Sequence, residues 1–291
     1  SMFGHAPPAV ARAIRRQANR GLTYMLPSKA ALRAGALMSA HFGDFIWQMT
    51  LSATDANRNA LRVARAITRK RKVLVFNGCY HGTLEDTMVE LSAGQTVARA
   101  GLVGQGFDLT KGAVCVEFKC VAGGMPTALW GMTAAVAKRF QTYDAARPSG
   151  HSGMGTTLAG NPMQFACLEA TLSDVATPEA FDHMNAGAAR LAKGLGAAIE
   201  QAGLPWHVLR VGARVEFICA PGPLLNGSQA TAAHHPSLEG ALHLGLLNRG
   251  CLIAPFHNMM LVSPVTTDNQ IDRLITAFTE VITELKDATH A

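Results

Sequence analysis

The sequence predicts an α/β protein whose C-terminal part forms a smaller α+β domain. In the first half, short apolar runs typical of buried strands alternate with amphipathic helical patterns, which favours a mainly parallel sheet between helices. In the second half, helices are mixed with short strands. Hydrophobic residues make up 48% of the 291 residues and charged residues only 16%, and this balance excludes an extensively disordered chain.

The first half contains three predicted helices and two predicted strands. Residues 6–20 place apolar residues at helical spacing after two prolines, which suit a helix start, and residues 29–43 repeat the helical pattern. The apolar run 45–51 (FIWQMTL) predicts a buried strand that leads into a helix over about 55–68. The run 73–76 (VLVF) predicts a second buried strand.

Helical patterns predominate from residue 162 onward. The predicted helices span about 162–174, 178–203, 236–249 and 268–286, and strand-like segments lie within 207–220, at 251–254 and at 259–263. We therefore predict a large domain over residues 1–174 and a small domain over residues 175–291.

The charge and the cysteines indicate which kinds of partner the protein binds and in which cellular compartment it is found. The formal charge is +6, and six basic residues crowd the end of the predicted helix at 55–68, where cations suit the helix C-terminus better than they indicate a nucleic-acid site. No uncharged apolar run approaches the roughly 18 residues of a membrane span. The six cysteines form no CxxC pair and are typical of buried thiols in a reducing compartment. With no secretory leader visible, we predict a cytoplasmic protein that binds neither nucleic acid nor membrane.

Two segments that follow predicted strands favour ligand binding. Ser52–Asn57 (SATDAN) opens a helix, where unpaired backbone N–H groups attract anions, although an ordinary N-cap explains the same residues. In the next segment Tyr80 and His81 stand between glycines and could stack on a flat heteroaromatic ligand, or form a turn with a half-buried tyrosine. No second ligand pair accompanies Cys79 and His81, so no metal site is predicted.

Two later segments carry a lysine and a threonine of interest. Lys119 lies among apolar residues before a Gly-Gly-Met-Pro turn; desolvation lowers the pKa of an amine and makes it a nucleophile that forms Schiff bases. The alternative is a surface lysine before a turn. The loop over residues 155–162 (GTTLAGNP) precedes a helix and could bind a phosphate through Thr157, or be a simple capped loop.

Taken in chain order, five segments resemble the motifs of the class III pyridoxal-phosphate-dependent aminotransferases, including the glutamate-1-semialdehyde aminomutase branch. The motifs they resemble are Gly-His-x-x-Pro (Phe3–Pro8), the Ser-Gly-Thr-Glu-Ala phosphate loop (Ser52–Asn57, with Ala53 in place of glycine), Gly-x-Tyr-His-Gly (Gly78–Gly82), the Schiff-base lysine with Gly-Gly-Met-Pro (Lys119–Pro126) and Thr-Leu-Ser-Gly-Asn-Pro (Thr157–Pro162).

The resemblance implies the fold and the cofactor. It implies fold type I, with a seven-stranded, mostly parallel sheet, and a homodimer that binds pyridoxal 5′-phosphate between subunits. Lys119 would form the Schiff base and move a proton, and Thr157 would reach the phosphate of the cofactor in the neighbouring subunit. The other cofactor-binding residues implied are Ser52, Ala53 and Thr54 at the phosphate, Tyr80 on the pyridine ring, and His81.

The implied activity is transfer of an amino group from an amine or amino acid to a carbonyl acceptor. An aminomutase, which returns the amine to the adjacent carbon of the same molecule, is the alternative. Arg214 could pair with a substrate carboxylate, or be a surface arginine at a strand edge, and we expect His257 to line the pocket.

One departure from the family pattern is large. Only 38 residues separate Tyr80 from Lys119, and no Asp-Glu pair lies between them, although the family uses such an aspartate to hold the pyridine nitrogen protonated. At about 30 residues for each βα unit, roughly 60–90 residues are absent. We therefore expect an interrupted large domain with a join at Phe118–Lys119. True absence of the aspartate would favour a noncatalytic remnant of the fold.

Overall fold

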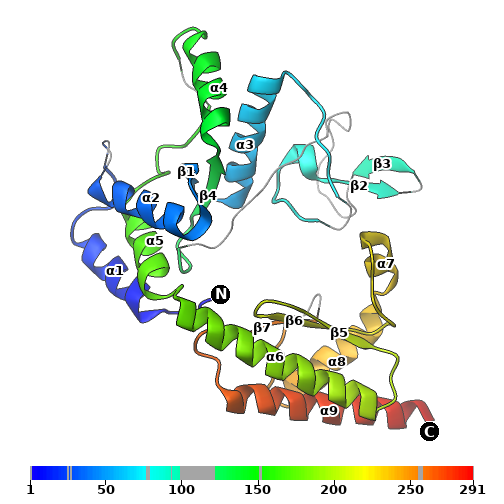
Figure 1. The fold of residues 1–291 in the computed structure, drawn as a ribbon. Coiled ribbons are helices and arrows are strands. Elements are labelled where there is room, and N and C mark those ends of the chain that lie inside the picture. The colour runs from blue at the N-terminus through cyan, green and yellow to red at the C-terminus, as the bar shows by residue number, and fades with distance from the viewer. Residues whose placement is uncertain are drawn as a thin grey trace. The chain divides into compact units, whose positions relative to one another are not determined.

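The protein forms two compact units (Figure 1). The first unit is His5–Ala176, and the second is Thr177–Ala291 together with Met2–Gly4. The computed structural model describes residues 2–24, 26, 28–76, 79–92, 94–98, 122–150, 153–254 and 258–290. No helix within these ranges is long and apolar enough to cross a membrane.

Helices are the main regular elements among the described residues of the first unit. Its elements are α1 (Pro8–Ala18), α2 (Lys29–Phe42), β1 (Ile46–Thr50), α3 (Ala53–Thr68), the short 3₁₀ helix η1 (Glu85–Thr87), β2 (Val89–Ser92), β3 (Gln95–Ala98), β4 (Ala128–Met132), α4 (Ala134–Ala145) and α5 (Pro162–Asp174). The four helices predicted in this part of the chain and the strand predicted at 45–51 are confirmed.

The strands of the first unit pair in two small antiparallel sheets. β1 pairs with β4, with Ile46 opposite Met132 and Thr50 opposite Ala128, and β2 pairs with β3. Among the described strands there is no parallel pair. The prediction of a strand at 73–76 is wrong for this structure, because these residues form no ladder with any of the described strands.

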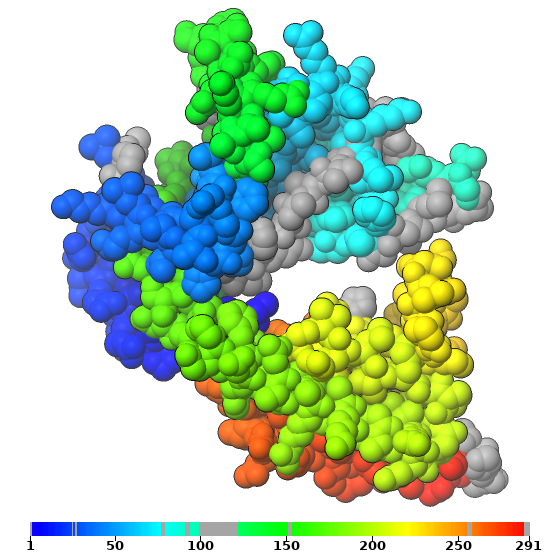
Figure 2. All heavy atoms as spheres, viewed as in Figure 1, coloured from blue at the N-terminus to red at the C-terminus, as the bar shows by residue number. Residues whose placement is uncertain are grey.

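The two larger of three clusters of buried side chains join the helices of the first unit. In one, α1 and α2 pack against α5, with Val10, Met38 and Leu168 at its centre. In the other, α3 packs against β4 through Val63 and Trp130. Figure 1 shows α4 beside α3. Ala137 alone is buried on α4, and in Figure 2 the atoms of this helix (green) stand out from the rest of the unit.

The basic segment at the end of α3 is tied to the loop that follows it. α3 ends at Thr68, and Arg65 in its last turn donates two hydrogen bonds to the carboxylate of Asp86, at 2.9 and 3.0 Å. Arg65 also donates to the carbonyl oxygen of Arg71 at 3.1 Å. The Arg65 guanidinium therefore holds Arg71 and Asp86, which follow α3, against the last turn of this helix.

The second unit is an α+β structure. Its elements are α6 (Pro178–Gln201), β5 (His207–Val211), β6 (Arg214–Ile218), α7 (Gly227–Ala232), α8 (Pro236–Asn248), β7 (Met259–Leu261) and α9 (Asp268–His290). The strands form one antiparallel sheet in the order β5-β6-β7. The helices predicted here and the strands within 207–220 and 259–263 are confirmed, whereas the strand predicted at 251–254 is wrong, since those residues pair with no strand.

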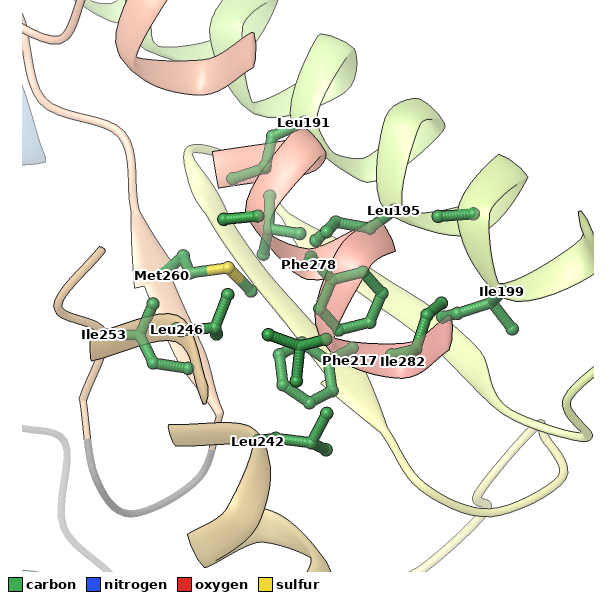
Figure 3. Packing of buried hydrophobic residues seen from close by; sticks show 14 of the residues in the cluster. Leu191, Leu195, Ile199, Phe217, Leu242, Leu246, Ile253, Met260, Phe278 and Ile282 are labelled. Carbon is green, nitrogen blue, oxygen red and sulfur yellow. The ribbon is translucent and has the colours of Figure 1, made fainter. Parts of the chain in front are cut away.

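The core of the second unit lies between this sheet and its helices (Figure 3). Phe217 from β6 and Phe278 from α9 are fully buried, and their ring centroids are 4.8 Å apart. Leu195 from α6 and Leu246 from α8 close the cluster. Every helix of eight or more residues in this unit thus contributes to one core.

Candidate functional site

The N-terminus of α3 presents backbone N–H groups that precede its first intrahelical hydrogen bond. Ser52 is the N-cap: its Oγ accepts a hydrogen bond from the Asp55 N–H at 3.1 Å and donates one to the Asp55 carboxylate at 2.7 Å. The first intrahelical bond runs from the Ala56 N–H to the Ser52 carbonyl oxygen, so the N–H groups of Ala53 and Thr54 precede it. These two donors, at the positive end of the helix dipole, suit an anion such as a phosphate.

The predicted ring-binding segment packs against this helix start. The Thr83 N–H donates to Thr54 Oγ1 at 3.1 Å, and Asn57 Nδ2 donates to the His81 carbonyl oxygen at 3.0 Å. Gly82 has a φ of +82°, and a Cβ added there would overlap Thr54 Oγ1 and lie 3.2 Å from Thr54 Cα. Glycine is therefore required for this approach. The fold thus joins two motifs that lie about 25 residues apart.

Tyr80 and His81 differ in exposure at this junction. The side chain of Tyr80 is 61% exposed, beside a helix start that can hold an anion. An exposed aromatic ring in that place can lie on a flat ring carried by the anion. His81 is half-buried, and its backbone oxygen, rather than its ring, makes the hydrogen bond to α3.

The Gly/Thr loop lies beside α3 in the same chain. Gly155, Thr156 and Ala159 line a cavity of about 160 Å³ together with Asp55 and Arg58 of α3. Thr157 is exposed on this loop. The loop ends in a capping box at the start of α5, where Asn161 Oδ1 accepts from the Gln164 N–H at 2.9 Å.

Lys119 and the join predicted at Phe118–Lys119 lie outside the described residues. The turn that follows them is described from Ala122, whose carbonyl oxygen accepts from the Met125 N–H at 3.2 Å. Gly123 has a φ of +59°, and a Cβ there would come within 2.8 Å of Val10 and 3.1 Å of the Thr171 hydroxyl. The Gly-Gly-Met-Pro turn is thus packed closely against α1 and α5.

Sequence reasoning missed Gln164, which connects three of these segments. This residue is fully buried in the first turn of α5. Its Nε2 donates to the carbonyl oxygens of Thr50, at 3.0 Å, and Pro126, at 2.9 Å. Its Oε1 accepts from the N–H groups of Gly160, at 2.7 Å, and Asn161, at 3.2 Å. The Asn-x-x-Gln spacing could have indicated the capping box, but nothing local indicates the bonds to Thr50 and Pro126.

The two residues predicted to contact substrate belong to the second unit. Arg214 lies in β6 and donates to Glu216 at 3.4 Å, and its side chain is 51% exposed. His257 lies outside the described residues. Arg214 therefore keeps guanidinium surface that a carboxylate can reach.

The thiols divide by burial. Burial raises the pKa of Cys167 to about 11 and is the main cause that raises the pKa of Cys219 to about 12, with the charge of Glu239 adding to the second. Both stay protonated near neutral pH. The prediction of buried thiols is thus confirmed for these two, but it is wrong for Cys79, which is exposed.

Comparison with known proteins identifies relatives along nearly the whole chain. The family model described as aminotransferase class-III matches residues 1–105. The chain is 25% identical to a glutamate-1-semialdehyde 2,1-aminomutase from Desulforudis audaxviator, over 96% of this chain and 83% of the relative. It is 35% identical to a glutamate-1-semialdehyde-aminomutase from Pseudomonas aeruginosa of known structure, with a TM-score of 0.91, covering 98% of this chain and 82% of that one. A variant of the Pseudomonas enzyme was solved in complex with PMP.

A more distant neighbour shares the fold. An omega-transaminase from Sphaerobacter thermophilus superposes with a TM-score of 0.82 at 18% identity, over 96% of this chain and 84% of that one. The fold type predicted from the five motifs is therefore confirmed.

The alignments also show a difference in length. The alignment with the Desulforudis enzyme extends over 365 positions, whereas this chain has 291 residues, so at least 74 aligned positions have no counterpart here. This number falls within the 60–90 residues expected to be absent.

Proposed function

Because the chain belongs to the class-III aminotransferase family, we propose that it binds pyridoxal 5′-phosphate and moves an amino group from an amine or amino acid to a carbonyl carbon. The observation that carries the proposal is the junction of the α3 N-terminus with the segment from Tyr80 to Thr83, held by the Thr83–Thr54 hydrogen bond and the close approach of Gly82. It combines an anion site with an exposed aromatic ring.

The described residues fit this cofactor. In the proposed mode, the N–H groups of Ala53 and Thr54, with the Ser52 hydroxyl, bind the phosphate. The ring of Tyr80 orients the flat face of the cofactor, and His81 lines the same side through its place next to Asn57. When bound, the cofactor supplies the electron sink for chemistry at the amine-bearing carbon, and the protein supplies orientation and electrostatics.

Lys119 is the proposed catalytic residue. Its amine would hold the cofactor and carry the proton that leaves one carbon and arrives at another. The turn after it is packed against α1 and α5 through Gly123, which supports a fixed position for the segment. In the second unit, Arg214 would bind a substrate carboxylate and His257 would line the substrate pocket.

We further propose a cytoplasmic homodimer in which Thr157 contacts the cofactor of the partner subunit. The exposure of Thr157 on a loop beside α3 supports this arrangement. A sedimentation experiment tests the dimer, since a monomeric mass would exclude it. A mixture of Thr157→Val and Lys119→Ala chains tests the sharing, because only a shared site restores activity in mixed dimers.

Cofactor binding is tested by titrating the full chain with pyridoxal 5′-phosphate and reducing the complex with borohydride. We expect one reduced pyridoxyl group per chain, mapped by peptide mass to Lys119, and its loss in Lys119→Ala. Lys138→Ala, which removes an exposed lysine of α4, is the matched control and should label as the parent does. Absence of specific labelling in the parent chain would refute the proposal and leave the noncatalytic remnant.

The second candidate is an aminomutase, and the 35% identity to the Pseudomonas enzyme favours it. The two activities are separated by adding an amino substrate without any carbonyl acceptor. A transaminase stops after one turnover and releases a carbonyl product, whereas an aminomutase continues to isomerise its substrate. Chromatography of the products over many turnovers distinguishes them.

A further inference from the structure

The side chain of Gln164, alone among the described residues, bridges the segments of three separate motifs. The carboxamide of glutamine offers two donors and two acceptor positions, and all four are used. The capping box accounts for the bond that Oε1 accepts from the Asn161 N–H, and the Gly160 N–H provides the second bond to this oxygen. The two bonds that Nε2 donates leave the helix altogether, to Thr50 and Pro126.

Each partner of this carboxamide adjoins a motif of the proposed site. Thr50 ends β1, two residues before the N-cap Ser52, and its own hydroxyl donates to the Ser52 carbonyl oxygen at 2.9 Å. Pro126 closes the turn that follows Lys119. Gly160 and Asn161 end the loop that carries Thr157. The phosphate-binding helix start, the lysine turn and the threonine loop therefore meet at one buried amide.

The helix that carries Gln164 is itself held in place by buried side chains. Cys167 and Leu168, on the next turn of α5, are both fully buried in the cluster that packs α1 and α2 against this helix. A buried amide group that loses a partner has no water to replace it. Displacement of any one of the three segments is therefore unfavourable, because it leaves a buried polar group without a hydrogen bond.

We infer that Gln164 is a positioning residue of the cofactor site, which holds the α3 N-terminus, the turn after Lys119 and the Thr157 loop in a fixed mutual arrangement. This inference rests on the proposed function, since it explains how the three segments of the same site keep their relative positions. It assigns no contact between Gln164 and the cofactor.

The test compares two substitutions of similar size with a neighbouring control. Gln164→Met removes all four hydrogen bonds, and Gln164→Glu keeps the acceptor oxygens but turns a carboxylate toward the carbonyl oxygens of Thr50 and Pro126. Cys167→Ala is the control, because it makes a small cavity on the same helix and removes none of the four hydrogen bonds of Gln164. For each full-length variant, Tm, the Kd for pyridoxal 5′-phosphate and hydrogen exchange of peptides covering the three segments are measured.

We expect both Gln164 variants to weaken cofactor binding at least tenfold and to exchange faster in all three segments. Cys167→Ala should lower Tm by a comparable amount and bind the cofactor as the parent does. Unchanged Kd in Gln164→Met, or a loss of affinity that follows Tm equally in the control, would overturn the inference while leaving the proposed function standing.

Failure of the parent chain to bind the cofactor is a distinct result, because it overturns the proposed function itself. Hydrogen exchange then decides whether the bridge exists: faster exchange confined to the three segments in Gln164→Met supports it, and unchanged exchange refutes it.

Discussion

Replacing Gly82 with alanine should destabilise the first unit by far more than a glycine substitution normally does. The residue has a φ of +82°, a conformation that disfavours any L side chain by about 1–2 kcal/mol. The added Cβ would also lie 3.2 Å from Thr54 Cα, which is backbone and cannot rotate away, and overpacking of this kind adds about 1–3 kcal/mol. Together these effects lower the free energy of unfolding by about 2–5 kcal/mol.

Gly94→Ala is the matched control for this prediction. Gly94 has a φ of +77°, and a Cβ built there meets nothing within 4 Å, so it carries the conformational penalty alone. Urea denaturation followed by circular dichroism should place Gly82→Ala about 1–3 kcal/mol below Gly94→Ala. The Gly82 variant should also lose affinity for pyridoxal 5′-phosphate. Equal stability of the two variants would refute the close packing of Gly82 on the α3 N-terminus.

Three other outcomes follow from the structure. Ser52→Ala should lower the free energy of unfolding by about 1 kcal/mol and weaken cofactor binding, whereas Ser52→Asn, which keeps the N-cap, should retain the stability in urea denaturation. Phe278→Ala should cost about 3–5 kcal/mol in the second unit, and the exposed Phe181→Ala much less, as calorimetry can show. The pKa values of Cys167 and Cys219 are raised to about 11 and about 12 in the folded protein, from 9.0. As pH rises, these thiols therefore ionise in the unfolded chain before they ionise in the folded one. The stability should therefore fall above about pH 9, and Cys219→Ala should reduce that slope in a pH series of denaturation curves.

A helix could be predicted from sequence where nearby residues determine both of its ends and where its buried residues recur at helical spacing. α5 has the predicted bounds because Asn161 caps it and Pro162 occupies its first turn, and its buried residues recur at helical spacing. α4 was missed because its apolar face is narrow: Ala137 is buried, and Val136 and Phe140 beside it are only partly buried.

The candidate site could be predicted only in part, because its motifs are local but its connections are not. The N-cap of α3 and the turn at Gly82 depend on neighbouring residues, and their types are visible in sequence. The donors of Gln164 reach residues 114 and 38 positions away. Such contacts depend on how the elements pack, which periodicity and spacing do not determine.

The failed prediction of a strand at 73–76 is related to the length of chain that this protein lacks relative to the Desulforudis enzyme. Val73 is buried, but Leu74 is 62% exposed and Phe76 is 65% exposed, an unusual state for side chains in a run typical of a fully buried strand. A parallel strand of that kind needs neighbours on both sides and cover on both faces. The alignment with the Desulforudis enzyme has at least 74 positions without a counterpart in this chain, enough for two βα units.

A lack of such neighbours would explain both why 73–76 pairs with none of the described strands and why Leu74 and Phe76 are exposed. If this explanation holds, Leu74→Ser changes the free energy of unfolding by no more than about 0.5 kcal/mol, as at an ordinary surface position. The same substitution at a covered strand would cost several times as much, because it would bury an unsatisfied hydroxyl and leave a cavity. Val73→Ser, at the buried neighbour, is the control and should destabilise clearly. A large loss in Leu74→Ser would show that other strands cover this run and that the first unit retains its parallel sheet.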